Sequence, residues 1–121
     1  MKPLRTLGLL ATLIASAMPE SADAQDAFAL RRAEMVAEIA AMARGTGTET
    51  GRPVFGGRVM TAMGKVQRHL LVPEEQVRYA YENRPLSIGH GQTISQPYIV
   101  ALMTDLMEPK ATDVVLEVGT G

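Results

Sequence analysis

The sequence predicts an α/β protein with a helical first part and the start of a sheet at its end. Apolar residues recur with helical spacing over residues 57–71 and 97–107. The segment Val-Val-Leu-Glu-Val at 114–118 is typical of a buried strand, and Gly-x-Gly follows it at 119–121. A strand that runs into Gly-x-Gly opens the nucleotide-binding loop of a doubly wound sheet. We therefore expect helices followed by the first strand of such a sheet.

Residues 1–24 have the pattern of an export signal. Lys2 and Arg5 precede an apolar run over residues 7–17, and Ala22-Asp23-Ala24 fits a small-x-small cleavage site. The run is too short to span a bilayer, which takes about 20 apolar residues. We predict cleavage after the last of these alanines and no stable membrane insertion afterwards. An uncleaved anchor, or a hydrophobic extension of a cytoplasmic enzyme, is the alternative.

Composition excludes several classes of function. A net charge of −1 provides no basic surface for nucleic acid. The absence of Cys removes disulfides, thiolate nucleophiles and Cys-based zinc sites, and we predict no metal site. The Gly- and Thr-rich segment 45–53 lacks the Gly-Lys-Ser/Thr ending of a phosphate-binding loop, so we interpret it as a connector.

Four helical segments are predicted before the final strand: residues 27–44, 57–71, 73–81 and 97–107. Each long helix is expected to bury one apolar stripe. The predicted stripes are Leu30, Met35, Ile39 and Met42 in the first helix; Val59, Met63, Val66 and Leu70 in the second; and Ile99, Leu102, Met103, Leu106 and Met107 in the last. Arg68 is expected to face away from the core, and His69 to be a surface or capping residue.

Residues 86–97 form the most informative stretch, and two interpretations of it are open. Gly89 and Gly91 allow a positive φ or the close approach of a ligand. The surrounding imidazole, hydroxyl and amide groups suit a ligand-binding loop. Alternatively the stretch is a tight turn and a helix cap, with Ser95 or Gln96 at the N-cap and a proline in the first turn.

Four motifs occur in a characteristic order: Arg68-His69-Leu70-Leu71-Val72-Pro73-Glu74-Glu75, Ala80-Tyr81-Glu82-Asn83, Ile88-Gly89-His90-Gly91-Gln92-Thr93-Ile94-Ser95-Gln96-Pro97-Tyr98 and Val115-Leu116-Glu117-Val118-Gly119-Thr120-Gly121. With them the sequence resembles the protein-L-isoaspartate O-methyltransferase family in its bacterial form. The resemblance implies the N-terminal part of a Rossmann-like methyltransferase. Residues 25–109 would be a helical region that carries a substrate loop at 86–97. Residues 110–121 would begin an incomplete cofactor-binding domain.

The resemblance also implies a reaction. The family moves the methyl group of S-adenosylmethionine to the α-carboxylate of isoaspartyl residues in damaged proteins and peptides, and the ester collapses to a succinimide on the way back to aspartate. Catalysis would be mainly positioning, because the substrate carboxylate is itself the nucleophile. A monomer is expected. The predicted signal indicates a periplasmic or secreted location, and the cytoplasm, where most members act, is the alternative.

Site residues follow from the matched motifs. Ser95 matches the family's active-site serine, and its hydroxyl would orient the substrate carboxylate without attacking it. Thr93 and Ile94 would offer backbone groups to the substrate peptide, much like an added strand. The residues expected to bind the cofactor are Gln92, Glu117, Gly119 and Gly121, with His90 shaping the same side.

Two other classes of protein remain as alternatives. A dinucleotide-binding oxidoreductase fragment is supported by the final strand and its Gly-x-Gly alone. A non-catalytic exported helical module is the other. A chain that ends within this motif is expected to be a fragment, inactive by itself, with its last strand unpaired.

Overall fold

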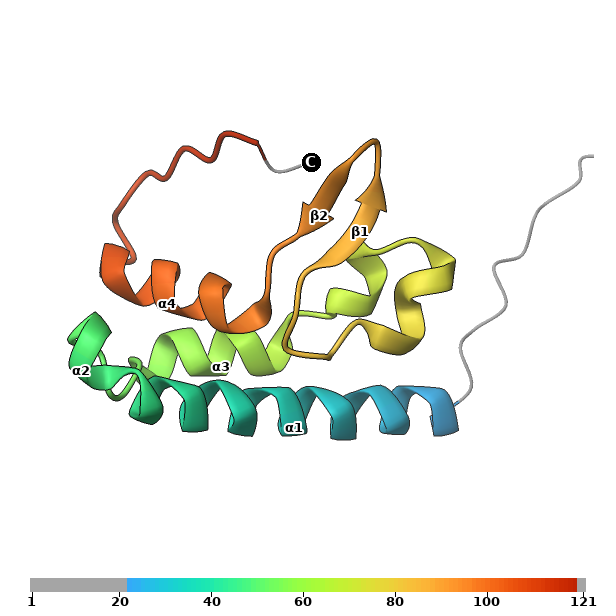
Figure 1. Ribbon diagram of the computed structural model, residues 1–121, viewed down its shortest axis with the longest axis horizontal. Coiled ribbons are helices and arrows are strands. Elements are labelled where there is room, and N and C mark those ends of the chain that lie inside the picture. Colours follow the sequence, from blue (N-terminus) through green and yellow to red (C-terminus); the bar gives the residue numbers. More distant parts are fainter. Residues whose placement is uncertain (1–21, 120–121) are drawn as a thin grey trace, which may run out of the picture.

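The computed structural model describes residues 22–119, with side chains from Ala27 onward, as a helical body that carries one hairpin (Figure 1). The elements are α1 (Ala22–Gly45), α2 (Gly47–Thr50), α3 (Gly57–Lys65), the 3₁₀ helices η1 (Arg68–Leu71) and η2 (Glu74–Tyr79), β1 (Leu86–Gly89), β2 (Gln92–Ile94) and α4 (Pro97–Met107). In Figure 1, α1 runs the length of the body, and α3 and α4 lie along it and contact each other. The mixture of helix and strand confirms the predicted α/β class. Of the helices described, none is long and apolar enough to cross a membrane.

The core joins all three long helices. Its cluster consists of Met35, Ile39, Ala43, Phe55, Val59, Ala80, Tyr81, Tyr98 and Ala101. The connector between α1 and α3 takes part, because the Phe55 ring packs on Tyr98 at a centroid separation of 5.8 Å. This connector also contains α2, a short helix that the Gly- and Thr-rich composition does not predict.

The buried side of α1 differs in part from the predicted stripe. Met35, Ile39 and Ala43, spaced four residues apart, are at most 2% exposed. Leu30 is 62% exposed and Met42 is 38% exposed, so these two predictions are wrong. Leu30 lies about 140° around the helix from Met35, at 3.6 residues per turn, and therefore cannot share its face.

The predicted second helix is interrupted. It ends at Lys65, Val66 is extended with ψ 126°, and η1 begins two residues later. The interruption changes which side chains face the core. Val66 and Leu70 are 51% and 67% exposed, whereas Arg68 and His69 are 6% and 4% exposed. The predictions for Val66, Leu70 and Arg68, made from an unbroken helical period, are therefore wrong, and so is the prediction that His69 is a surface or capping residue.

The bounds of α4 agree with the prediction, but its buried face does not. The buried residues are Pro97, Tyr98, Ala101 and Asp105, and the exposed ones are Ile99, Met103, Leu106 and Met107. Apolar residues occupy most of this helix, so hydrophobicity alone does not select a face. Polar contacts do: Tyr98 Oη lies 2.6 Å from Thr46 Oγ1, and Asp105 Oδ1 accepts a hydrogen bond from the Gly56 amide at 2.6 Å.

Residues 113–117 have no regular secondary structure, so the predicted buried strand is not present in the described part of the chain. Val114, Leu116 and Val118 are 100%, 86% and 87% exposed. A single strand has no partner to satisfy its amides and carbonyls, which agrees with the expectation that it is unpaired. In Figure 1 this segment leaves the end of α4 and returns toward the hairpin.

Candidate functional site

The predicted substrate loop is an ordered hairpin. β1 and β2 pair antiparallel with Leu86 opposite Ile94 and Ser87 opposite Thr93. The turn has three consecutive residues with positive φ: Gly89 at 94°, His90 at 52° and Gly91 at 71°. The two glycines thus adopt the left-handed conformations that their freedom permits, as predicted.

The helix cap after the hairpin differs from the simple cap interpretation. The N-cap position of α4 is Gln96, and its side chain makes no capping hydrogen bond. Asn83 supplies the cap instead, because its Oδ1 accepts a hydrogen bond from the Tyr98 amide at 2.9 Å. Of the two residues predicted for the N-cap, Gln96 therefore occupies that position, and Ser95 lies one residue before it and is exposed.

The backbone of Ser95 is held by a buried arginine. Arg68 Nη2 donates to the Ser95 carbonyl oxygen at 2.7 Å, and Arg68 Nε donates to the Ala80 carbonyl oxygen at 2.8 Å. Burial lowers the pKa of Arg68, but an arginine remains a cation near neutral pH. The helical period missed this residue, although it stands first in the motif that begins Arg-His-Leu-Leu.

β2 places the predicted substrate-binding residues along one strand. Within residues 22–119 the sheet has only β1 and β2, so β2 has an unpaired edge. Thr93 and Gln92 are exposed, and Ile94 is half-buried. An unpaired strand edge presents amides and carbonyls that can pair with an extended peptide.

A pocket of about 390 Å³ lies beside this hairpin. Its lining includes Ile88 and Ile94 of the hairpin, Val100 of α4, Arg68 and Glu117. The structure thus brings one predicted substrate-binding residue and one predicted cofactor-binding residue to the same pocket. The other predicted residues are not in its lining.

The first glycine of the cofactor motif has a backbone conformation that favours glycine. Gly119 has φ 88°, a conformation that other residues rarely adopt, and among the described residues beyond its chain neighbours no atom lies within 4 Å of the Cβ position there. Glu117 precedes it on the same segment, and Gly121 lies outside the described residues. Across residues 22–119, His, Cys, Asp and Glu form no group of three that could hold a metal.

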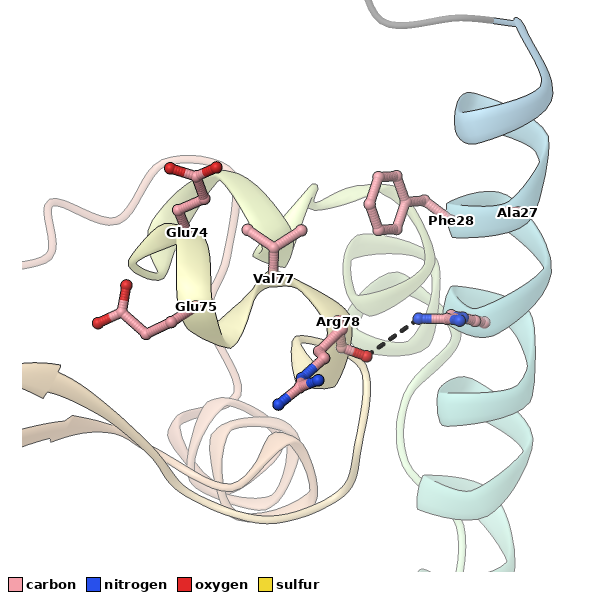
Figure 2. Close-up of a pocket in the computed structure, with 7 residues that line it drawn as sticks. Ala27, Phe28, Glu74, Glu75, Val77 and Arg78 are labelled. Carbon is pink, nitrogen blue, oxygen red and sulfur yellow. Dashed lines mark hydrogen bonds between the residues drawn. The ribbon is translucent and has the colours of Figure 1, made fainter.

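A second hollow, of about 780 Å³, lies between the start of α1 and η2 (Figure 2). Figure 2 shows Phe28 pointing from α1 toward η2, and Arg31 Nη1 donates to the Arg78 carbonyl oxygen at 3.0 Å. None of the predicted site residues lines this hollow. Because its charged side chains do not converge on one point in Figure 2, we place the candidate site at the hairpin.

His69 is buried in the packing beside this hollow, although the sequence predicts a surface or capping residue. Its ring stacks on Phe28 at a centroid separation of 4.1 Å. Its Nδ1 lies 2.6 Å from Tyr81 Oη, which also accepts a hydrogen bond from Arg32 at 2.9 Å. These contacts hold η1 and the segment after η2 against α1. They therefore also hold Arg68, which belongs to η1, in place.

The helical region, the open-edged Gly-rich hairpin and the Gly-x-Gly sequence that follows agree with the N-terminal part of a Rossmann-like methyltransferase. The family model described as "Protein-L-isoaspartate(D-aspartate) O-methyltransferase (PCMT)" matches residues 49–121. The chain belongs to this family, which confirms the resemblance found in the sequence. The match gives no support to a dinucleotide-binding oxidoreductase.

Curated relatives agree with the family match. The chain is 58% identical over 120 residues to protein-L-isoaspartate O-methyltransferase 1 of Cupriavidus necator, covering 98% of this chain and 46% of that protein. It is 63% identical over 87 residues to protein-L-isoaspartate O-methyltransferase 2 of a Polaromonas species, covering 72% and 41%. For protein-L-isoaspartate O-methyltransferase 2 of Syntrophobacter fumaroxidans the identity is 54% over 98 residues, covering 81% and 40%. The chain therefore spans less than half the length of these relatives.

Proposed function

We propose that the full-length protein transfers a methyl group from S-adenosylmethionine to the α-carboxylate of isoaspartyl residues in damaged proteins and peptides. The observation that carries this proposal is the presentation of Ser95. Its hydroxyl is exposed at the end of an open-edged strand, while its carbonyl oxygen is held by Arg68 at 2.7 Å. A fixed backbone with an available hydroxyl suits a residue that orients a substrate.

The substrate peptide would lie along the unpaired edge of β2. Thr93 and Ile94 would pair with its backbone, which recognises an extended chain without demanding a particular sequence. The Ser95 hydroxyl would donate a hydrogen bond to the isoaspartyl carboxylate and fix its orientation. A hydrogen bond to a charged group is about twice as strong as a neutral one, so one hydroxyl can contribute measurably.

The nucleophile needs no general base, because a carboxylate is already ionised near neutral pH. The task of the protein is to aim the carboxylate and exclude water from it. Ile88, Ile94 and Val100 provide an apolar wall beside the hairpin. Removing water from a carboxylate raises its reactivity as a nucleophile.

The residues at the start of the cofactor motif are compatible with S-adenosylmethionine, which supplies an electrophilic methyl group when bound. Gly119 and Gly121 would bring the backbone close to the ligand, and Glu117 and Gln92 would contribute polar contacts. The positive φ of Gly119 supports this assignment.

Export is the second part of the proposal. Residues 1–24 have the charge, apolar run and small residues of a signal. The proposed substrates are then isoaspartyl proteins outside the cytoplasm. A cytoplasmic enzyme with an uncleaved N-terminus is the alternative.

The reaction is tested with purified full-length protein, radiolabelled S-adenosylmethionine and two peptides that differ only in one residue. The peptide that contains isoaspartate should gain label, and the peptide that contains aspartate should not. Equal labelling of both peptides, or of neither, contradicts the proposed substrate.

A further inference from the structure

Arg68 is a buried cation that binds carbonyl oxygens. The residue is 6% exposed, and no carboxylate forms an ion pair with it within the described part of the chain. Its hydrogen bonds go to the carbonyl oxygens of Ala80 and Ser95. Burying a charge is costly unless it is hydrogen-bonded, and these two carbonyl oxygens supply hydrogen bonds that offset part of that cost.

The two carbonyls belong to different parts of the molecule. Ala80 is 0% exposed and lies in the core cluster just after η2. Ser95 lies between β2 and α4, where its side chain is exposed. Arg68 therefore connects a fixed point of the helical body to the residue that carries the proposed substrate-orienting hydroxyl.

The guanidinium group suits this connection for a geometric reason. Its donors lie in one rigid plane, so Nε and Nη2 define the separation and direction of both acceptors at once. A lysine ammonium is a single point charge on a flexible stem and cannot hold two separate carbonyls in the same way. The arginine thus constrains Ser95 along more than one direction.

We propose that Arg68 is a positioning residue that sets the place of the Ser95 hydroxyl through the Ser95 backbone, an inference that rests on the proposed function. Displacements near 1 Å in a reacting group can reduce turnover strongly, about a hundredfold in documented cases. Arg68 does not need to touch the substrate for this effect. Its contribution should appear in turnover and should disappear when the Ser95 hydroxyl is absent.

The test compares Arg68→Lys with Arg58→Lys in the full-length protein. Arg58 is a matched control, because it is exposed and also donates to a carbonyl oxygen, that of Pro109 at 2.7 Å, away from the hairpin. Arg68→Lys should lower kcat for an isoaspartyl peptide about tenfold, with the affinity for S-adenosylmethionine unchanged. Arg58→Lys should match the wild type.

Counting active molecules by cofactor titration keeps kcat per folded molecule measurable if Arg68→Lys folds poorly, and Arg68→Gln serves as a second variant.

Two further measurements separate positioning from general stabilisation. In a Ser95→Ala background, Arg68→Lys should cost less than twofold, because the group it positions is gone. Hydrogen exchange over residues 92–98 should be faster in Arg68→Lys than in Arg58→Lys, while exchange in α1 stays the same. Equal kcat and equal exchange in the two lysine variants overturn the inference. So does a tenfold loss that persists in the Ser95→Ala background.

The two proposals fail in different ways. If the wild-type protein does not methylate the isoaspartyl peptide, the proposed function is wrong, and the exchange comparison alone still tests whether Arg68 fixes the segment. If the wild type is active and Arg68→Lys behaves like Arg58→Lys, only the role of Arg68 is wrong.

Discussion

Asn83 caps α4 from the other side of the hairpin: its Oδ1 accepts a hydrogen bond from the Tyr98 amide at 2.9 Å. The two residues flank the hairpin in sequence, so this contact closes the loop that carries the proposed substrate site. The N-terminal amides of a helix otherwise lack partners within the helix. One side chain therefore completes the helix and holds the base of the hairpin together.

Asn83→Ala should destabilise the protein by about 1 kcal/mol, the usual cost of losing a cap. Asn83→Asp should be close to wild type, since it keeps the acceptor and adds a negative charge near a helix N-terminus. Urea unfolding of both variants measures the difference. Equal stability of the alanine variant and the wild type would show that the contact contributes nothing.

The turn glycine Gly89 should not tolerate a side chain. Its φ of 94° lies where other residues are strained, so Gly89→Ala should cost about 1–2 kcal/mol and weaken substrate-peptide binding. Gly45→Ala is the control, because Gly45 ends α1 and, among the described residues outside its own turn of helix, no atom lies within 4 Å of its Cβ position. Thermal unfolding and peptide KM should separate the two variants. An alanine at residue 89 with normal KM would show that the turn does not shape the site.

Much of the local structure can be predicted from the sequence, but the side of each helix that faces the core cannot. The proline at the start of α4 and the Glu-Pro pair after it define both ends of that helix. Its buried side depends on Tyr98 and Asp105, whose partners lie far away in the chain. Likewise, no local pattern predicts the interruption at Val66 that turns Arg68 inward.

The candidate site, too, can be predicted from the sequence only in part. The paired glycines predict the turn, and the family motif selects Ser95. The arginine that binds the Ser95 carbonyl is 27 residues away in sequence, so only the fold reveals the contact. Roles that depend on the cofactor remain predictions, since residues 114–118 have no strand partner in the described part of the chain.

A polypeptide of residues 1–121 should not bind S-adenosylmethionine at micromolar concentration. Val114 and Leu116 are 100% and 86% exposed, so the segment that leads to Gly119 has no packing to hold the cofactor loop in place. Isothermal titration calorimetry of this polypeptide should show no binding. A micromolar Kd would mean that the cofactor site lies within the helical region instead.

The export proposal predicts a mature N-terminus at Gln25. Mass spectrometry of the protein from the periplasm or medium should identify a chain that starts there, because Ala22-Asp23-Ala24 forms the cleavage pattern. Replacing Ala24 with a large residue such as Leu should block processing, and Ala29→Leu serves as a control beyond the site. Recovery of intact protein from Met1 in the cytosol contradicts the prediction.

The central claim is that the Ser95 hydroxyl orients the substrate carboxylate, and the Ser95→Ala variant of the full-length protein tests it. No hydrogen bond of this hydroxyl is present within the described residues, and the side chain is exposed, so stability should change by no more than about 0.5 kcal/mol. Ser95→Thr keeps the hydroxyl but adds a methyl group, and should retain partial activity.

The decisive measurement is kcat/KM of Ser95→Ala for an isoaspartyl peptide, with the Kd of S-adenosylmethionine measured alongside. Loss of a hydrogen bond to a charged group costs about 1.5–3 kcal/mol, which corresponds to a fall of roughly ten- to a hundredfold in kcat/KM. The cofactor Kd should be unchanged. Full activity of Ser95→Ala would contradict the account.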